Sequence, residues 1–269
     1  MKRLKIQAYC QVLKTLNNNI GVNGIMMQLD NAIEWDTSKR NKLELRQIKG
    51  LKGWLRHKYM KYYNQKEIEV CYSTSKEEYK DRKVNIPRGY HLLGECDGKC
   101  PIYNIFGGIV TKKEKSSELN RTSKISIFCP PVISKEGYFK LNDESKKQVG
   151  LNDYNVMHFG IESSSAIGEN DESLQNFSKQ FLSGNFMFYI DISKLDMDEI
   201  KVLIDVLLKT DNQLGSSKTY GNGHIELKEI KYEDVNITYS LCEDGKIIKR
   251  EDIKDLTREL FQIVESHIY

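Results

Sequence analysis

The chain has 269 residues, of which 39% are hydrophobic and 29% are charged. This composition is typical of a globular protein and excludes collagen-like, disordered and low-complexity classes. The 41 Lys and Arg residues against 38 Asp and Glu residues give a net charge of only +3, so a basic binding surface would have to arise from the distribution of charge rather than from its sum.

No run approaches the roughly 20 apolar residues that span a bilayer, and the first residues turn polar where a signal peptide would have its apolar stretch. We therefore expect a cytoplasmic protein without membrane contact. The six cysteines are too sparse for a disulfide framework in a chain of this length. Reduced thiols, with two or three on a metal, are the expectation.

The chain is predicted to open with a strand, because apolar and polar residues mostly alternate from Arg3 to Leu16. Asparagines and glycines then predict a loop over 17–24, where positive φ angles are tolerated and backbone amides are left accessible. After a polar break, residues 43–48 lead into a predicted helix over 49–63.

That helix is predicted from an apolar stripe formed by Leu51, Leu55 and Tyr59. Basic residues, among them Lys58, are expected outside the stripe. Because glycines stand at the start of the helix, its free amides point at whatever binds there. A solvated basic helix face is the alternative explanation of this pattern.

Residues 64–135 have only short apolar runs and contain all four prolines, which predicts an inserted subdomain between two parts of a core, 1–63 and 136–269. In the second part, a buried strand over 186–192 precedes an amphipathic helix over 196–209 with an acidic first turn. Residues 225–230 have strand-like spacing, and 252–266 predict a last helix.

The glycine-rich segment from Gly215 to Gly223 lies between a helix and a strand, whereas a Walker A loop runs from strand into helix. Nucleotide hydrolysis is therefore disfavoured. The loop could instead hold amides against phosphates while Tyr220 stacks on a base; a long turn is the alternative. Together with the basic helix start, it gives these candidate RNA-binding residues: Lys49, Lys52, Arg56, Lys218, Tyr220, Asn222 and His224.

A candidate metal site lies in the predicted insertion. His91, Cys96 and Cys100 supply nitrogen and sulfur donors, with Cys71 or Cys129 available as a fourth ligand. A structural Zn²⁺ would hold together a segment poor in apolar residues. Buried free cysteines that pack as small hydrophobic side chains are the alternative.

Four segments in the same order resemble the repeat-associated mysterious protein (RAMP) superfamily of CRISPR effector subunits. The segments at 47–56 and 214–224 resemble its turn before the first helix and its C-terminal glycine loop. Leu29-Asp30-Asn31-Ala32-Ile33-Glu34-Trp35-Asp36 resembles its I-D-x-P-V-x-x-D segment, and residues 100–108 resemble its C-P-x-C-x-L-F-G. The likeness is to the Cas-seven-like backbone subunit, particularly its type III version.

The resemblance implies an α+β fold with a ferredoxin-like core derived from the RNA-recognition motif, carrying inserted subdomains in a palm, thumb and fingers arrangement. It also implies stacking with other copies of the chain along a crRNA, which is gripped by its sugar-phosphate backbone, while base pairing with the target RNA gives specificity. Other CRISPR effector subunits are the remaining expected partners.

The resemblance further puts forward Asp30 as the residue that cleaves target RNA with Mg²⁺ or Mn²⁺. A turn-capping role for Asp30 is the structural alternative. Two functional alternatives stay open: a non-catalytic, type I-like crRNA scaffold, and an unrelated nucleotide-binding enzyme that uses the same loops.

Overall fold

The structure is a computed structural model. It describes residues 2–14, 22–28, 42–48, 50–72, 88–91, 96–108, 122–139, 141–143, 146, 155–168, 171–210, 213–214, 222–234, 237–243 and 246–247. The predicted last helix over 252–266 lies outside these residues. In the described part of the chain, no helix is long and apolar enough to cross a membrane.

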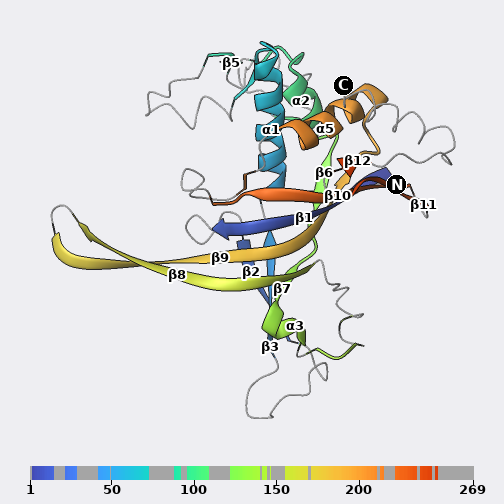
Figure 1. Cartoon of the computed structure of the whole chain (residues 1–269). Helices are drawn as coiled ribbons and strands as arrows, with labels where there is room; N and C mark the ends of the chain where they lie inside the picture. The colour runs from blue at the N-terminus through green and yellow to red at the C-terminus, as the bar shows by residue number, and fades with distance from the viewer. Residues whose placement is uncertain are drawn as a thin grey trace.

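Among the described residues, a ten-stranded sheet organises the molecule, in the order β12-β11-β10-β1-β9-β8-β7-β3-β2, with β6 paired to β9 beside this path. Figure 1 shows helices α1, α2 and α5 on one side of β10, β1 and β9. The first half of the chain supplies β1 (Lys2–Lys14), β2 (Val22–Gln28), β3 (Lys42–Ile48), α1 (Leu51–Gln65), β4 (Val70–Cys71), β5 (Tyr90–His91), α2 (Pro101–Phe106), β6 (Ser126–Phe128), β7 (Val132–Ser134) and α3 (Lys135–Phe139). The second half supplies β8 (Val156–Gly168), β9 (Asp171–Asp191), α5 (Met197–Lys209), β10 (Ile225–Asp234), β11 (Ile237–Glu243) and β12 (Lys246–Ile247).

Six of these elements carry the core of the fold. In chain order they are β1, α1, β6, β9, α5 and β10, and the strands pair antiparallel in the order β10-β1-β9-β6. This is the β-α-β-β-α-β order of a ferredoxin-like motif. The α+β class predicted from the sequence is confirmed.

The core forms where the inward side chains of the strands meet the helices. On β1 the alternating Leu4, Ile6, Ala8 and Cys10 are buried, as the period of two predicts. Across the sheet, Phe186, Phe188 and Ile190 of β9 are fully buried on the same side, and the Phe188 ring meets Trp54 of α1 edge-on at 5.9 Å between centroids. The opening strand and the strand predicted over 186–192 are thus confirmed.

Helix α5 begins where the sequence predicts. Asp196 accepts a hydrogen bond from the Glu199 amide at 2.9 Å, and the Glu199 carboxylate accepts one from the Asp196 amide at 3.1 Å. This reciprocal pair is a capping box, which satisfies two amides that a helix start leaves without partners.

Helix α1 is buried on more than the predicted stripe. Lys58, expected in solvent, is only 2% exposed, and its ammonium donates to the Leu207 and Thr210 carbonyls at 3.1 and 3.3 Å. The prediction of an exposed Lys58 was wrong because α5 packs against that side of α1. A lysine there supplies donors to carbonyls that a helix end leaves unpaired.

Two further findings differ from the sequence interpretation. Strand β2 begins at Val22, inside the loop predicted over 17–24, because pairing with β3 from Val22↔Ile48 onward engages its backbone. Strand β6 pairs with β9, and strand β7 pairs with β3 and β8. The C-terminal part of the predicted insertion therefore contributes to the main sheet.

Strands β8 and β9 form a long hairpin that projects well beyond the rest of the described chain (Figure 1). Between Lys14↔Phe181 and the hairpin end at Gly168↔Asp171, β9 has no described strand partner other than β8. The sequence interpretation did not predict this ribbon.

Candidate nucleic-acid interface and metal centre

The start of α1 presents backbone donors without a side-chain cap. Gly50 precedes the helix at φ 81°, in the left-handed region that favours glycine, and no side chain caps the first turn. The first turn also contains no acidic residue. Because the helix dipole adds positive potential there, the geometry suits an anion such as a phosphate.

Two cations reinforce this potential. The pKa of Lys52 is lowered by partial burial and by the nearby charge of Arg56. The Nε and Nη2 atoms of Arg56 are buried and find no hydrogen-bond acceptor among the described residues. Like charges held close together, without a described carboxylate between them, favour binding of an anion.

A pocket of ≈ 500 Å³ opens at this helix start. Residues 48 and 50–52 line it on the side of α1, and residues 123 and 125–129, which include all of β6, line the other side. Backbone groups at the helix start and the side chain of Lys52 thus adjoin one pocket.

The glycine-rich loop is described only at its ends, which are tied together. The Leu214 amide donates to the Gly223 carbonyl at 2.8 Å, and Gln213 forms a bridge with His224. Gly223 has φ 77°, and a Cβ there would lie 1.8 Å from the Leu214 oxygen. Only glycine therefore allows this closure between α5 and β10.

Among the predicted RNA-binding residues, the structure brings together Lys52 and Arg56, one turn apart on α1. Asn222 and His224 lie at the start of β10, where Ile225 pairs with Cys10. Along β9, the start of β10 is level with Gly184, because Cys10 lies opposite that residue. Strand β6 pairs with residues 189–191 of β9. The start of β10 and β6 are therefore offset by roughly 16 Å along the strands. The remaining predicted site residues lie outside the described part of the chain: Asp30, Lys49, Lys218 and Tyr220.

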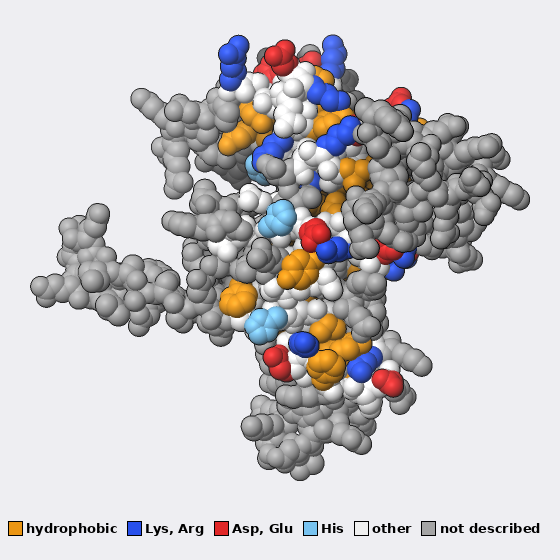
Figure 2. Space-filling model, in the orientation of Figure 1, with side chains coloured by type: hydrophobic (Ala, Val, Ile, Leu, Met, Phe, Trp, Pro, Cys, Tyr) orange, Lys and Arg blue, Asp and Glu red, His pale blue; other side chains and the backbone are white. Residues whose placement is uncertain are grey.

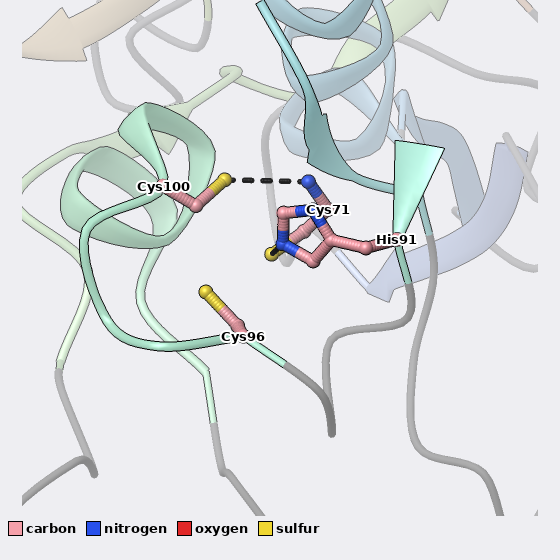
Figure 3. Close-up of side chains that lie close together, drawn as sticks. All are labelled: Cys71, His91, Cys96 and Cys100. Carbon is pink, nitrogen blue, oxygen red and sulfur yellow. Dashed lines mark hydrogen bonds between the residues drawn. The ribbon is translucent and has the colours of Figure 1, made fainter. Parts of the chain in front are cut away.

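The predicted metal ligands do gather in space. Cys71, His91, Cys96 and Cys100 each offer one ligand atom, and these four atoms all lie within 4.8 Å of one another. Figure 3 shows the four side chains converging from β4, β5 and the loop before α2. The ligand atoms of a tetrahedral zinc site lie about 3.8 Å apart, so the spacing fits such an ion.

Hydrogen bonds link three members of this Cys3His cluster. The Cys71 amide donates to the Cys100 sulfur at 3.3 Å, and the Cys71 sulfur lies 3.2 Å from His91 Nε2 (Figure 3). The other ring nitrogen, Nδ1, lies 3.5 Å from a Glu69 carboxylate oxygen. A carboxylate on the outer ring nitrogen is how proteins commonly orient a histidine that binds a metal.

The thiols of Cys71 and Cys100 have pKa values shifted in opposite directions. A hydrogen bond from the Cys71 side chain lowers the pKa of the Cys100 thiol despite its burial, with help from the Tyr103 amide. The same pairing raises the pKa of Cys71. A thiolate at Cys100 is the form of cysteine that binds a metal.

The structure also decides between the two fourth ligands that the sequence left open. Cys129 is buried away from the cluster, its sulfur 3.5 Å from the Met187 carbonyl, and burial raises the pKa of its thiol to about 12. Cys71 joins the cluster because β4 pairs with β5, placing it beside His91. Their separation of 20 residues is no usual ligand spacing, so sequence alone left this pairing open.

On the face shown in Figure 2, Lys and Arg side chains at the top of the molecule are interspersed with carboxylates, and no uniformly basic area is visible among the described side chains. This distribution agrees with the small net charge.

Comparison with known proteins gave the following matches. The first is to Csc2 of Thermofilum pendens, with 12% identity, a TM-score of 0.45, and coverage of 98% of this chain and 76% of that chain. A chain of a type IV-B CRISPR complex has 10% identity and a TM-score of 0.47, and the match covers 89% of this chain and 93% of that chain. A chain of the type III-B Cmr-beta complex bound to cognate target RNA has 13% identity and a TM-score of 0.38, and the match covers 86% of this chain and 60% of that chain.

No sequence among the curated proteins matches this chain. The sequence does match the RAMP superfamily over residues 48–226, which is more than half of the chain. The matched region includes α1 with its basic start, the Cys3His cluster and the glycine-rich loop. The chain belongs to the RAMP superfamily.

Proposed function

We propose that this chain is a backbone subunit of a CRISPR RNA-guided effector complex, which binds crRNA along its sugar-phosphate backbone. The observation that carries the proposal is the start of α1, where uncapped amides and Lys52 adjoin the pocket beside β6 and Arg56 lies one turn further along the helix. Such groups recognise phosphates and give no base specificity. Membership of the RAMP superfamily supports the same conclusion.

Binding of single-stranded RNA tests this proposal. Lys52→Ala combined with Arg56→Ala should weaken affinity by at least about tenfold, because each hydrogen bond from a charged group contributes roughly 1.5–3 kcal/mol. The slope of log affinity against log salt should also become shallower, by about 0.7 for each phosphate that the variant no longer neutralises. Fluorescence anisotropy with a labelled oligonucleotide measures both quantities.

The matched control removes the same charge from the other end of the helix. Lys61 and Lys66 are exposed at the C-terminal end of α1, and their double alanine variant should bind RNA like the wild type. Equal decreases of affinity in both double variants would show a non-specific charge effect. Retention of a mononucleotide without RNA during purification would instead favour the nucleotide-binding enzyme.

Stacking of copies along the RNA is part of the proposal. Head-to-tail contacts between identical subunits that do not close into a ring generate open filaments. The β8–β9 hairpin supports this arrangement, because a two-stranded ribbon is marginally stable in water by itself and reaches well beyond the body of the molecule (Figure 1). A second copy or another effector subunit would give it a packing surface.

We also propose that Asp30 cleaves target RNA with Mg²⁺ or Mn²⁺, which would neutralise charge on the scissile phosphate. Asp30 follows β2 by two residues, on the segment that leads to β3 and then to the α1 start. This finer proposal rests on the resemblance of 29–36 to the superfamily's segment.

The test of the cleavage proposal uses the assembled complex with complementary RNA. Asp30→Ala should abolish cutting and leave crRNA binding intact, whereas Asp36→Ala should retain most of the activity, and EDTA should stop the wild type. If the wild-type complex binds the target but leaves it uncut, the chain is the non-catalytic scaffold.

The Cys3His cluster fits a structural Zn²⁺, and we propose that Cys71, His91, Cys96 and Cys100 hold it. Bound zinc would supply no chemistry to the reaction. It would tie β4 and β5 to the loop before α2, next to α1.

A further inference from the structure

The direction of the backbone groups on β6 follows from the hydrogen bonds of its neighbour β9. Just after β9, the Ile192 amide donates to the Lys2 carbonyl of β1 at 2.9 Å. Backbone groups along an antiparallel strand point alternately to the two neighbouring strands. Ile190 therefore also turns its N–H and C=O toward β1, whereas Asp191 and Tyr189 turn theirs toward β6.

This alternation assigns a direction to each residue of β6. Ser126 and Phe128 lie opposite Asp191 and Tyr189, so β9 engages the N–H and C=O of both residues. Ile127 lies between them and turns its N–H and C=O away from β9. Among the described residues, no strand pairs with this edge, and neither backbone group of Ile127 has a hydrogen-bond partner.

The residue two positions earlier supports this assignment. The same alternation turns the Ile125 carbonyl away from β9, and this carbonyl accepts a hydrogen bond from the Ser123 hydroxyl at 2.6 Å. The side chain of Ile127 packs against the core. The Ile127 peptide groups are therefore held in a fixed direction at the edge of the sheet.

The pocket at the start of α1 lies along this edge. Its lining includes all five consecutive residues 125–129. Side chains of a strand alternate between its two faces, so a pocket over one face would be lined by every second residue only. Because β9 occupies the other edge of β6, the N–H and C=O of Ile127 face the pocket, opposite the side lined by residues 48 and 50–52.

A donor and an acceptor side by side select the chemistry of the group that binds them. A phosphate offers only acceptors and would leave the Ile127 carbonyl unpaired, whereas a hydroxyl both donates and accepts. In RNA the ribose carries such a hydroxyl, the 2′-OH, beside each phosphate, and DNA lacks it. A peptide strand could also pair with the edge, but its neutral backbone has no use for the Lys52 ammonium on the facing side.

We infer that the main-chain N–H and C=O of Ile127 hydrogen-bond to a ribose 2′-hydroxyl in the pocket and thereby make the site select RNA over DNA. This inference rests on the proposed function and adds a specificity-determining residue to it. DNA would leave both groups of Ile127 without partners in the filled pocket, and a site built to bind a hydroxyl rejects the analogue that lacks it.

Affinities for oligoadenylate and oligodeoxyadenylate of equal length test the inference, because the bases of the two are identical. The wild type should bind the RNA about 5- to 150-fold more tightly, the range expected for two hydrogen bonds. Ile127→Pro removes the N–H alone. It should weaken RNA binding by about 2- to 12-fold and leave DNA binding unchanged. Ile127→Val, the conservative variant, keeps the N–H and should restore the preference.

Thermal unfolding tests the direction of the N–H independently of RNA. Proline is tolerated on an edge strand where the N–H points away from the sheet, so Ile127→Pro should be about as stable as the wild type. Phe128→Pro, the matched variant, removes an N–H that β9 engages and should melt at a clearly lower temperature. An Ile127→Pro variant as destabilised as Phe128→Pro would place the Ile127 N–H in the ladder and overturn the inference.

The outcomes distinguish this inference from the proposed function. If the wild type binds RNA and DNA equally, or if Ile127→Pro weakens both equally, the 2′-hydroxyl contact is wrong. The proposed function then still stands if Lys52→Ala with Arg56→Ala weakens RNA binding. If Ile127→Pro abolishes self-association but keeps the preference for RNA, the edge receives a strand of a second copy and the inference is overturned. If the wild type binds no RNA at low salt, the proposed function itself fails.

Discussion

At the residue scale, Lys58 shows how one side chain joins two helices of the core. Its ammonium donates to the Leu207 and Thr210 carbonyls at the end of α5 and lies 5.0 Å from the Trp54 ring centroid. Burial of an ammonium costs free energy, but the partial negative charge of a helix C-terminus offsets part of this cost.

Lys58→Met is expected to lower the free energy of unfolding by about 1–3 kcal/mol, because the two carbonyls lose a charged donor and stay buried. Lys61→Met, at an exposed position on the same helix, should change it by less than about 0.5 kcal/mol. Urea denaturation of the two variants measures this difference. A Lys58→Met variant as stable as the wild type would mean that the burial cost of the ammonium cancels its hydrogen bonds.

At the scale of elements, the Cys3His cluster lies where three short pieces of secondary structure meet. Strands β4 and β5 have two residues each, and α2 has six. Apolar contacts contribute as well, since Ile102, Tyr103 and Phe106 of α2 are buried in the main core. The expectation that this segment lacks apolar anchoring was therefore too strong, and metal would add to packing rather than replace it.

Removal of zinc with a chelator is expected to lower the melting temperature. Free zinc at 100 times Kd stabilises the fold by about 2.7 kcal/mol, which corresponds to a shift of roughly 5–10 °C for a domain of this size. Differential scanning calorimetry with and without chelator measures the shift, and mass spectrometry of the purified protein measures zinc content.

Two variants provide the control for this prediction. Cys96→Ala should lose zinc, whereas Cys129→Ala should keep it, although both thiols are buried. A purified wild type free of zinc, with a melting temperature insensitive to chelator, would identify the cluster as packed free thiols.

At the scale of the whole molecule, one sheet connects the two candidate regions of the RNA interface. The α1 pocket adjoins β6, and the glycine-rich loop returns to the sheet at β10, with β9 and β1 between these two strands. We expect one extended RNA strand to contact both in succession, with the hairpin formed by β8 and β9 left to reach a neighbouring subunit.

Local patterns in the sequence were sufficient to determine several parts of this protein. Strand β1 and helices α1 and α5 could be predicted because periodicity and capping depend on residues two to four positions apart, as in Asp196 and Glu199. Local patterns also predicted that the glycine-rich loop lies between a helix and a strand. It also grouped His91, Cys96 and Cys100 as candidate ligands.

Contacts between distant segments were decided only by the tertiary structure. The pairing of β4 with β5 selects Cys71 over Cys129 as the fourth member of the cluster, and the packing of α5 on α1 buries Lys58. The stacking of Phe128 on Tyr189 likewise depends on pairing between strands that lie far apart in the sequence. Strand register and helix packing are set by which surfaces can be buried together, a property of the whole chain that no local window contains.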